Sequence, residues 1–334
     1  MYAVVLVGGF GTRLRPLTYD VPKPMLPVGH RPMIVRLVER LAAAGVTDVV
    51  LALGFKPEPF ATAFPEGVHA LADGGTVQVH YAVEPEPLDT AGAIAFAARA
   101  VGVDETFVVA NGDIITDLHV ADLVAAHRAS GRAATIHLTP VPDPSAFGVV
   151  EYDPDGTVQR FVEKPAPGET DSNLINAGTY VFEPEVLDLI PVDAKLSVER
   201  DTFPKLVAAG GLGAYATDDY WIDAGRPELF LAANLDLIDG RREITEPAVA
   251  EGADVDPQAC VERSVVGRGA VVEPGADVRR SVLLPGSRVG RGAIVADSIV
   301  AGEVGPGASL ANCVVGAGYA VAGGAVLAAV RLPE

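Results

Sequence analysis

The residues that could do chemistry begin at position 8, where the stretch GGFGTRLRP follows the apolar run of residues 4–7. Three glycines give a flexible backbone whose successive N–H groups can cradle phosphate oxygens. Arg13 would add a forked donor that binds phosphate through two hydrogen bonds. The stretch fits neither GxGxxG nor a Walker loop, which requires Gly-Lys-Ser/Thr. A plain tight turn is the alternative, but it explains one glycine better than three.

A second candidate is Lys23 in VPKPMLP, residues 21–27, where three prolines stiffen the backbone around a single lysine. A side chain on a stiff backbone loses little further entropy when it binds, so Lys23 is suited to be a fixed cation for a triphosphate. A solvated turn is the alternative interpretation. The neighbouring glycine stretch favours the phosphate-binding one.

These motifs together carry a resemblance to a known family. GGFGTRLRPLT followed by PKPMLP resembles the sugar nucleotidyltransferases, also called NDP-sugar pyrophosphorylases. The later motifs keep that family's order: NGD at 111–113, FGVVE at 147–151, FVEKP at 161–165, NAGTYVF at 176–182 and YWIDAGRP at 220–227. The resemblance covers essentially the whole chain, because the family often ends in a left-handed β-helix.

The resemblance implies a nucleotide site and a metal site. Its nucleotide-binding set is Leu6, Gly8, Gly9, Gly11, Thr12, Arg13, Lys23, Glu84, Asp89 and Gly112, with Arg13, Lys23 and Asp113 in catalytic roles. Asp113 follows a β-run and a glycine, so its carboxylate would project from the carboxyl end of a strand. Asp113 and Asp223 match the family's metal ligands, and two carboxylates plus substrate phosphates are how proteins usually hold Mg²⁺. For an isolated Asp, a cap or turn role is the alternative.

A sugar-phosphate site is implied further along the chain. By resemblance Lys164 binds the phosphate of a sugar 1-phosphate, and Glu163 accepts hydrogen bonds from sugar hydroxyls. Neighbours on a strand point to opposite faces, so both can act only if the chain twists there. A surface salt bridge is the alternative. The remaining predicted members of the sugar pocket are Gly148, Asn176 and Gly178.

The segment AVEPEPLDTAG, residues 82–92, resembles the family's base-reading stretch. Guanine presents N1–H and N2–H₂ as adjacent donors, and a carboxylate only accepts, so Glu84 or Asp89 could select guanine. Asp89 stands where the guanylyltransferase pattern has glycine. The alternative is that Asp89 caps the following helix.

The implied reaction is nucleotidyl transfer from GTP to mannose 1-phosphate, which yields GDP-mannose and pyrophosphate. The choice of guanine rests on EPLDTAG and on SVERDTFP at 197–204. The choice of mannose rests on the resemblance alone. The alternatives are a glucose-1-phosphate thymidylyl-, uridylyl- or adenylyltransferase and a non-catalytic sensor of nucleotide sugars. An additional acyltransferase activity in the C-terminal part is disfavoured, because such sites need a general base and all six histidines precede residue 138.

The elements that must position these residues alternate between strand and helix up to about residue 240. Apolar β-rich runs occur at 4–7, 48–53, 77–83, 106–113 and 133–141, and amphipathic stretches at 34–45, 90–101 and 120–131. This alternation predicts an α/β, Rossmann-like domain over residues 1–240, with a mixed, mostly parallel sheet. Such sheets bind ligands at the carboxyl ends of their strands.

The second predicted domain, residues 246–334, has a six-residue apolar period instead of a helical one. Its rows are Val249, Val255 and Val261; Val266, Val272 and Val278; Leu283, Val289 and Val295; Val300, Val304 and Leu310; and Val315, Val321 and Leu327. This hexapeptide pattern predicts five coils of a left-handed parallel β-helix. The last coil has no further coil to cover it, and residues 300–327 carry few charges, which predicts a homo-oligomer through this domain.

Composition narrows the partners and the location. A formal net charge of −19 argues against nucleic acid and anionic membranes, so the expected partners are small-molecule substrates. The N-terminus lacks a secretory pattern and no stretch is long and apolar enough to span a membrane. The two cysteines, Cys260 and Cys313, are expected to be buried free thiols of a cytoplasmic protein.

Overall fold

The computed structural model describes residues 1–9, 11–54 and 57–333, in which the chain divides into two compact units. The first unit is Met1–Gly8 with Ile34–Trp221, and the second is Gly9–Met33 with Ile222–Glu334. The second unit therefore combines most of the glycine stretch with the C-terminal repeat. Phe10, inside that stretch, lies outside the described residues.

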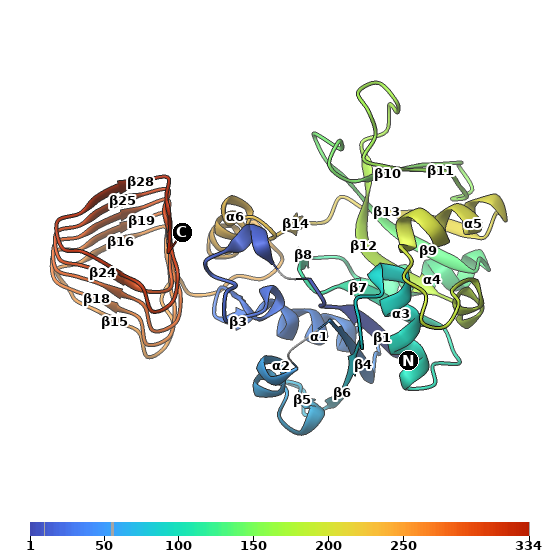
Figure 1. Ribbon diagram of the computed structural model, residues 1–334, viewed down its shortest axis with the longest axis horizontal. Coiled ribbons are helices and arrows are strands. Elements are labelled where there is room, and N and C mark those ends of the chain that lie inside the picture. Colours follow the sequence, from blue (N-terminus) through green and yellow to red (C-terminus); the bar gives the residue numbers. More distant parts are fainter. Residues whose placement is uncertain (10, 55–56, 334) are drawn as a thin grey trace. The chain divides into compact units, whose positions relative to one another are not determined.

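A mixed sheet forms the centre of the first unit (Figure 1). Its parallel core consists of β1 (Tyr2–Leu6), β4 (Asp48–Leu53), β6 (Thr76–Val83) and β7 (Phe107–Asn111), in the order β7-β1-β4-β6. Both interior strands are buried, so their sequences are continuous apolar runs and do not alternate. The carboxyl ends of β1 and β7 consequently lie side by side, with Leu6 paired to Asn111.

The outer strands of this sheet are largely antiparallel, which confirms a mixed sheet. They are β5 (Val68–Ala70), β9 (Ala134–Pro140), β10 (Gly148–Tyr152), β11 (Val158–Glu163), β12 (Leu174–Phe182) and β13 (Leu212–Ala216). The order continues from β7 through β12 and β10 to β11 with antiparallel pairing, while β13 joins β9 in parallel. Parallel pairing is thus confined to the core strands and the β9–β13 pair.

The helices at Met33–Ala43, Asp89–Ala100 and Val120–Ser130 occur where the amphipathic stretches predicted them, whereas two shorter helices of the first unit were not predicted. The full set is α1 (Met33–Ala43), α2 (Glu58–Ala63), α3 (Asp89–Ala100), α4 (Val120–Ser130) and α5 (Phe203–Ala208), with a short π-helix, η5, at Val198–Thr202. Helix α3 packs on β1, β4 and β6, and α4 packs on β9, β12 and β13. The alanine-rich face of α3 lies in one buried cluster with Val4, Val109 and Tyr180. This packing fixes the loops that leave the sheet.

The N-terminal part of the second unit is short and irregular. It contains the 3₁₀ turns η1 (Thr12–Leu14) and η2 (Lys23–Met25) and the small hairpin of β2 (Pro27–Val28) and β3 (Arg31–Pro32). Helix α6 (Pro227–Ile238) packs on β2 and on Val265–Val266 of the repeat. A buried Asn234 side chain accepts a hydrogen bond from the Gly29 N–H at 2.8 Å. Segments 9–33 and 222–334 are therefore joined by specific contacts.

The repeat forms three parallel sheets of five short strands, the faces of a β-helix (Figure 1). The first is β15 (Asp254–Val255), β18 (Val271–Val272), β21 (Arg288–Val289), β24 (Glu303–Val304) and β27 (Ala320–Val321). The second is β16 (Cys260–Glu262), β19 (Asp277–Arg279), β22 (Ile294–Ala296), β25 (Ser309–Ala311) and β28 (Val326–Ala328). The third is β17 (Val265–Val266), β20 (Val282–Leu283), β23 (Ile299–Val300), β26 (Val314–Val315) and β29 (Arg331–Leu332).

The predicted apolar rows pair in the predicted register. Val255 pairs with Val272 and Val261 with Val278, and the equivalent pairs continue through the later coils. These side chains form one cluster along the inside of the coils, with Val255, Val261 and Leu327 partly buried. The predicted inward position is wrong for Val249, which is 39% exposed at the start of the first coil. The five predicted coils of the left-handed β-helix are confirmed.

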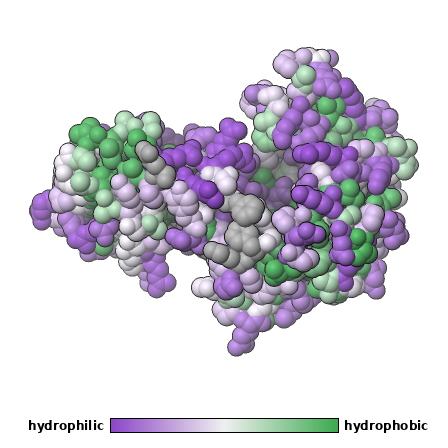
Figure 2. Space-filling model, in the orientation of Figure 1, coloured by the Kyte–Doolittle hydropathy of each residue, from purple (hydrophilic) through white to green (hydrophobic). Residues whose placement is uncertain are grey.

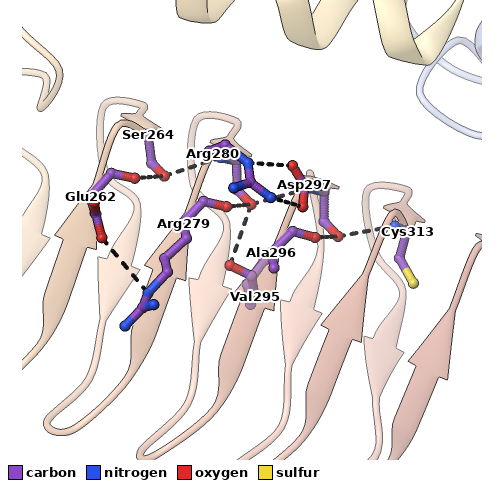
Figure 3. Close-up of polar contacts among 10 residues, drawn as sticks. Glu262, Ser264, Arg279, Arg280, Val295, Ala296, Asp297 and Cys313 are labelled. Atoms are coloured by element: carbon purple, nitrogen blue, oxygen red, sulfur yellow. Dashed lines mark hydrogen bonds and ion pairs between the residues drawn. The ribbon is translucent and has the colours of Figure 1, made fainter.

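A ladder of hydroxyl groups runs along one corner of the β-helix (Figure 3). The Oγ of Ser264 accepts the N–H of Ser281 at 3.0 Å, the Oγ of Ser281 accepts the N–H of Ser298 at 3.1 Å, and the Oγ of Ser298 accepts the N–H of Cys313 at 2.9 Å. Each bond satisfies a buried backbone donor that the turn leaves without a strand partner. The ladder therefore ties successive coils together.

The expectation of two buried cysteines is wrong for Cys260, which is exposed, while Cys313 is buried and both thiols are free. The reason is strand alternation: Val261 points inward as part of its row, so its neighbour Cys260 points outward. Among the helices of the described residues, none has the length and apolar composition needed to cross a membrane.

Candidate active site

A cluster of opposite charges lies in the second unit, at η1, η2 and the end of β14 (Trp221–Asp223). The Nζ of Lys23 is 3.0 Å from Oδ1 of Asp223, and Nη2 of Arg13 is 3.9 Å from Oδ2 of the same carboxylate. The Lys23 side chain is only 7% exposed, whereas that of Arg13 is 59% exposed. Lys23 is therefore a fixed cation, and Arg13 presents its guanidinium to solvent.

The backbone around this cluster needs glycine at position 11 but not at position 9. Gly11 has a left-handed φ of 58°, and a Cβ there would lie 3.1 Å from the Thr18 side chain. Thr18 Oγ1 donates to the Gly11 carbonyl at 2.8 Å, which fixes the turn. Gly9 is exposed and nothing lies within 4 Å of a Cβ built on it. The stretch thus combines a constrained turn at Gly11 with open backbone at Gly9. Thr12, directly after Gly11, is also exposed.

Gly225 belongs to this cluster although the sequence did not single it out. A Cβ at Gly225 would lie 2.8 Å from Oδ1 of Asp223, 2.8 Å from Nζ of Lys23 and 3.1 Å from Nη2 of Arg13. A side chain at this position would displace the ends of these charged side chains. The sequence signal that could have identified Gly225 is its position two residues after Asp223 in YWIDAGRP.

In the first unit, the predicted Asp113 directly follows the junction of β1 and β7. The Gly112 N–H donates to the Leu6 carbonyl at 2.9 Å, and a Cβ at Gly112 would lie 2.6 Å from Val7 Cγ1. Glycine is therefore required for this close approach, and it places the half-buried Asp113 at the carboxyl edge of the parallel core, before β8 (Ile114–Thr116).

The segment Asn176 to Gly178 forms an irregularity in β12, where the register against β9 shifts. Gly178 has φ of 77°, and a Cβ there would lie 2.6 Å from the side-chain nitrogen of Asn111. The Asn176 amide donates to the buried Tyr180 hydroxyl at 2.9 Å and accepts the Gly178 N–H at 3.0 Å. Burial, with a contribution from Glu199, holds the pKa of Tyr180 well above its ordinary value, so the phenol stays neutral. The Asn176 amide is thus held in one orientation.

Glu163 and Lys164 meet the condition that the chain twists between them. Strand β11 ends at Glu163, and Lys164 has a left-handed φ of 52°. Their charged groups consequently lie on one side, with Nζ 3.4 Å from Oε1, and the Lys164 side chain is 62% exposed. Opposite them, Gly148 leaves room for the Phe161 ring, which would be 2.4 Å from an added Cβ. The space beside Gly148 is therefore occupied by the Phe161 ring.

The predicted base-reading segment is built around the buried Glu84. Its Oε2 accepts the Leu88 N–H at 2.8 Å, and burial raises the pKa of the carboxyl group above its ordinary value. Asp89 has φ of 59°, a conformation that favours glycine and that Asp tolerates better than most residues. Its Oδ1 accepts the N–H of Thr90 at 2.8 Å at the start of α3. This geometry explains why the family pattern has glycine at this position.

Two segments that pointed to guanine contact each other. Thr90 Oγ1 donates to Oε2 of Glu199 at 2.9 Å and accepts the Val198 N–H at 2.8 Å. A Cβ on Gly92 would lie 2.3 Å from the carbonyl oxygen of Ala194, three residues before the second segment, so the glycine permits a close approach there. Thr90, in EPLDTAG, and Glu199, in SVERDTFP, are further candidate site residues.

The structure brings predicted residues together in one polar cluster in the second unit and in separate contacts in the first unit. The second unit joins Arg13 and Lys23 to Asp223. The first unit joins Glu163 to Lys164, Asn176 to Gly178, and Gly112 to Leu6, while Glu84 binds Leu88 and Asp89 binds its neighbour Thr90. The buried Lys23 and the exposed Arg13, beside glycine-rich backbone, form a group that can bind phosphate.

The chain belongs to the nucleotidyl transferase family, which matches residues 2–240, and residues 246–329 match the GlmU-like C-terminal hexapeptide family. It is a sugar-1-phosphate nucleotidyltransferase, as the sequence predicted. It is 39% identical over 276 residues to a mannose-1-phosphate guanyltransferase of Gibberella zeae, with 79% of this chain and 74% of that protein covered. The protein of the same name from Schizosaccharomyces pombe is 40% identical over 274 residues, with the same shares covered.

Two solved structures share the fold. A putative glucose-1-phosphate thymidylyltransferase from Bacillus anthracis, in complex with a sucrose, has a TM-score of 0.63 and 25% identity, covering 74% of this chain and 97% of its own. HddC from Yersinia pseudotuberculosis, complexed with GMP-PN, has a TM-score of 0.57 and 30% identity, covering 70% of this chain and 97% of its own.

Proposed function

We propose that the protein transfers a guanylyl group from GTP to mannose 1-phosphate and forms GDP-mannose and pyrophosphate. The observation that carries the proposal is the buried Lys23 held at Asp223 beside Arg13, a cation arrangement suited to nucleotide phosphates. The relatives named mannose-1-phosphate guanyltransferase support the substrate pair, and the HddC complex with GMP-PN supports a guanine nucleotide.

In the proposed reaction an oxygen of mannose 1-phosphate attacks the α-phosphorus of GTP in line. A phosphorus–oxygen bond forms there, the bond to the bridging oxygen of the β-phosphate breaks, and pyrophosphate leaves with the electron pair. The attacking oxygen is already an anion, so the protein needs no nucleophile of its own. The task of the chain is to orient the reactants and neutralise charge.

Each cluster has a proposed task in this reaction. Arg13 and Lys23 bind the phosphates of GTP, while Lys164 binds the phosphate of the sugar. Glu163 accepts hydrogen bonds from sugar hydroxyls, and the bulge at Asn176 and Gly178 orients the sugar ring. The exposed ammonium group of Lys164 and its neighbour Glu163 can reach one ligand together, since their charged atoms are 3.4 Å apart.

Nucleotidyltransferases of this family generally use a divalent metal. We propose Mg²⁺ with Asp113 and Asp223 as its ligands. Both supply carboxylate oxygens, the donors that Mg²⁺ prefers, and both are half-buried, so the residues fit the ion by their chemistry. When bound, Mg²⁺ would neutralise phosphate charge. Lys23 already fixes one oxygen of Asp223, which orients the carboxylate.

The decisive experiment is pyrophosphate release measured over a grid of GTP, ATP, UTP and dTTP with several sugar 1-phosphates. We expect GTP with mannose 1-phosphate to have the highest kcat/KM. Highest kcat/KM with glucose 1-phosphate and dTTP, the pair suggested by the Bacillus anthracis structure, would instead establish the thymidylyltransferase alternative. No release with any pair would contradict the proposed reaction.

A substitution distinguishes the two roles proposed for Asp89. If its carboxylate reads guanine, Asp89→Gly lowers the preference for GTP over ATP by about tenfold, the scale of one lost polar contact. If Asp89 serves only the left-handed turn, glycine keeps the preference and preserves the fold, because it adopts φ of 59° without strain. Glu84→Gln on the same grid tests the second candidate reader.

We also propose a homo-oligomer, a dimer or tetramer, that assembles through the β-helix. Hydrophobic residues gather at the end of the β-helix labelled β28 (Figure 2). There Val326 is 81% exposed, an unusual degree for valine. Catalysis is proposed to reside in residues 1–240. The cytoplasmic location stays a prediction.

A further inference from the structure

We propose that Arg331, in the last strand of the β-helix, is a positioning residue for residues 11–16, which we call the nucleotide-binding loop. Its Nη1 donates to the backbone carbonyl of Arg13 at 2.8 Å, across 318 positions of sequence. This inference rests on the proposed role of Arg13 in binding nucleotide phosphates. Arg331 itself is exposed, and its tie to the loop is a charge-assisted hydrogen bond to a main-chain oxygen.

A second contact from the neighbouring coil supports this role. Gly316 follows β26, and a Cβ built on it would lie 2.8 Å from Cβ of Pro16. The Gly316 N–H donates to the Leu332 carbonyl at 2.7 Å, so the two coils hold each other beside the loop. Pro16 is buried, three residues after Arg13. The loop is thus packed at Pro16 and tied by a hydrogen bond at Arg13.

The remainder of the segment is anchored to the same part of the chain. The Gly29 N–H donates to Asn234, and the His30 N–H donates to Oε2 of Glu246 at 3.0 Å. Held in this way, the loop loses less conformational entropy when it binds phosphate, so its affinity for the nucleotide is higher. The β-helix therefore acts on the nucleotide-binding loop from the far end of the sequence.

Steady-state kinetics of the full chain test this inference. Arg331→Ala is expected to raise the KM for the nucleotide about fivefold and to leave the KM for the sugar 1-phosphate unchanged. Gly316→Ala, which pushes on Pro16, is expected to do the same, while Arg331→Lys, which keeps a cationic donor, gives a smaller change. The control is Arg268→Ala, another exposed arginine of the β-helix, with unchanged constants. Equal changes in both KM values, or none, would overturn the proposal.

Limited proteolysis gives a readout that does not depend on the reaction. Release of the Arg13 carbonyl should expose the Arg13–Leu14 bond, so trypsin should form the 1–13 fragment several-fold faster in Arg331→Ala than in wild type or Arg268→Ala. An unchanged rate would contradict the proposed tie. Because the assay needs no substrate, it remains decisive even if the grid of nucleotides shows a different reaction.

Discussion

At the scale of single residues, reactive groups are placed by unusual backbone at their own positions. Lys164 and Asp89 adopt left-handed φ values, and Gly178 permits a bulge beside Asn176. Such conformations cost energy for residues other than glycine, and they persist where the surrounding structure compensates. Left-handed residues also occur elsewhere, as at Arg263 and Arg280 in the β-helix, but at Asp89 and Lys164 this conformation sets the direction of a predicted site residue.

Lys23 and Lys164 should affect different substrates, because each is proposed to bind a different phosphate. We expect Lys23→Ala to raise the KM for the nucleotide about tenfold or more, with little change for the sugar 1-phosphate, and Lys164→Ala to do the reverse. Initial rates with each substrate varied in turn measure both constants. Equal effects of one substitution on both KM values would refute this division.

The two proposed metal ligands should be essential for turnover and dispensable for folding. Asp113→Asn and Asp223→Asn preserve shape but remove the negative charge, so turnover should fall about 100-fold or more while circular dichroism stays unchanged. Asp223→Asn also removes the anionic partner of Lys23, so its KM for the nucleotide should change as well. Near-normal turnover in both variants would end the metal-ligand assignment.

At the scale of elements, the β-helix shows how a repeat buries its apolar rows and pairs its own backbone hydrogen-bonding groups. Its apolar rows pack inward in register, and the serine ladder accepts the N–H groups at one corner. At the fourth position of the ladder Cys313 replaces serine, and its N–H is still accepted by Ser298. Stability of this domain thus depends on repeated local contacts between neighbouring coils.

Ser281→Ala should destabilise the protein by about 1–3 kcal/mol, because the buried N–H of Ser298 loses its acceptor. Ser287→Ala is the matched control, since Ser287 is equally buried but its hydroxyl has no hydrogen-bond partner among the described residues. Removal of that hydroxyl should be neutral or stabilising. Urea unfolding followed by circular dichroism compares them, and equal losses would show that the ladder carries no stability.

At the scale of the whole molecule, the chain is organised differently from a simple order of two sequence domains. Residues 9–33 form one compact unit with residues 222–334, although the family match for the transferase runs from 2 to 240. Removal of the β-helix would therefore take away partners of the nucleotide-binding loop, such as Arg331 and Glu246. Assembly is better tested by surface substitutions than by truncation.

The exposed apolar end of the β-helix should mediate assembly. We expect light scattering to show a dimer or tetramer for the wild-type chain, and Val326→Asp to shift it to monomer, because burial of the charge would be unfavourable. Ile294→Asp, at an exposed position of an inner coil, should keep the wild-type mass. A monomeric wild type at micromolar concentration, or assembly that survives Val326→Asp, would contradict the proposal.

The sequence by itself determined the features that rest on local period. Rows of aliphatic residues specified the coils and their register, because a one-residue slip would turn every row toward solvent. Alternating strand and helix patterns specified the α/β sheet, and ordered motifs indicated the transferase family. The assignment of Glu163 and Lys164 was also conditional on a local twist that the backbone contains.

Only the tertiary structure decided which distant segments meet. Lys23 and Asp223 are separated by 200 positions and Arg331 and Arg13 by 318, and no spacing rule relates such residues. A Cβ at Gly225 would crowd two side chains from the other end of the chain, and Thr90 meets Glu199 because α3 packs on η5. The period of the apolar residues indicates which face of an element is buried. Which other element packs on that face depends on shape and charge, which act only when the elements pack together.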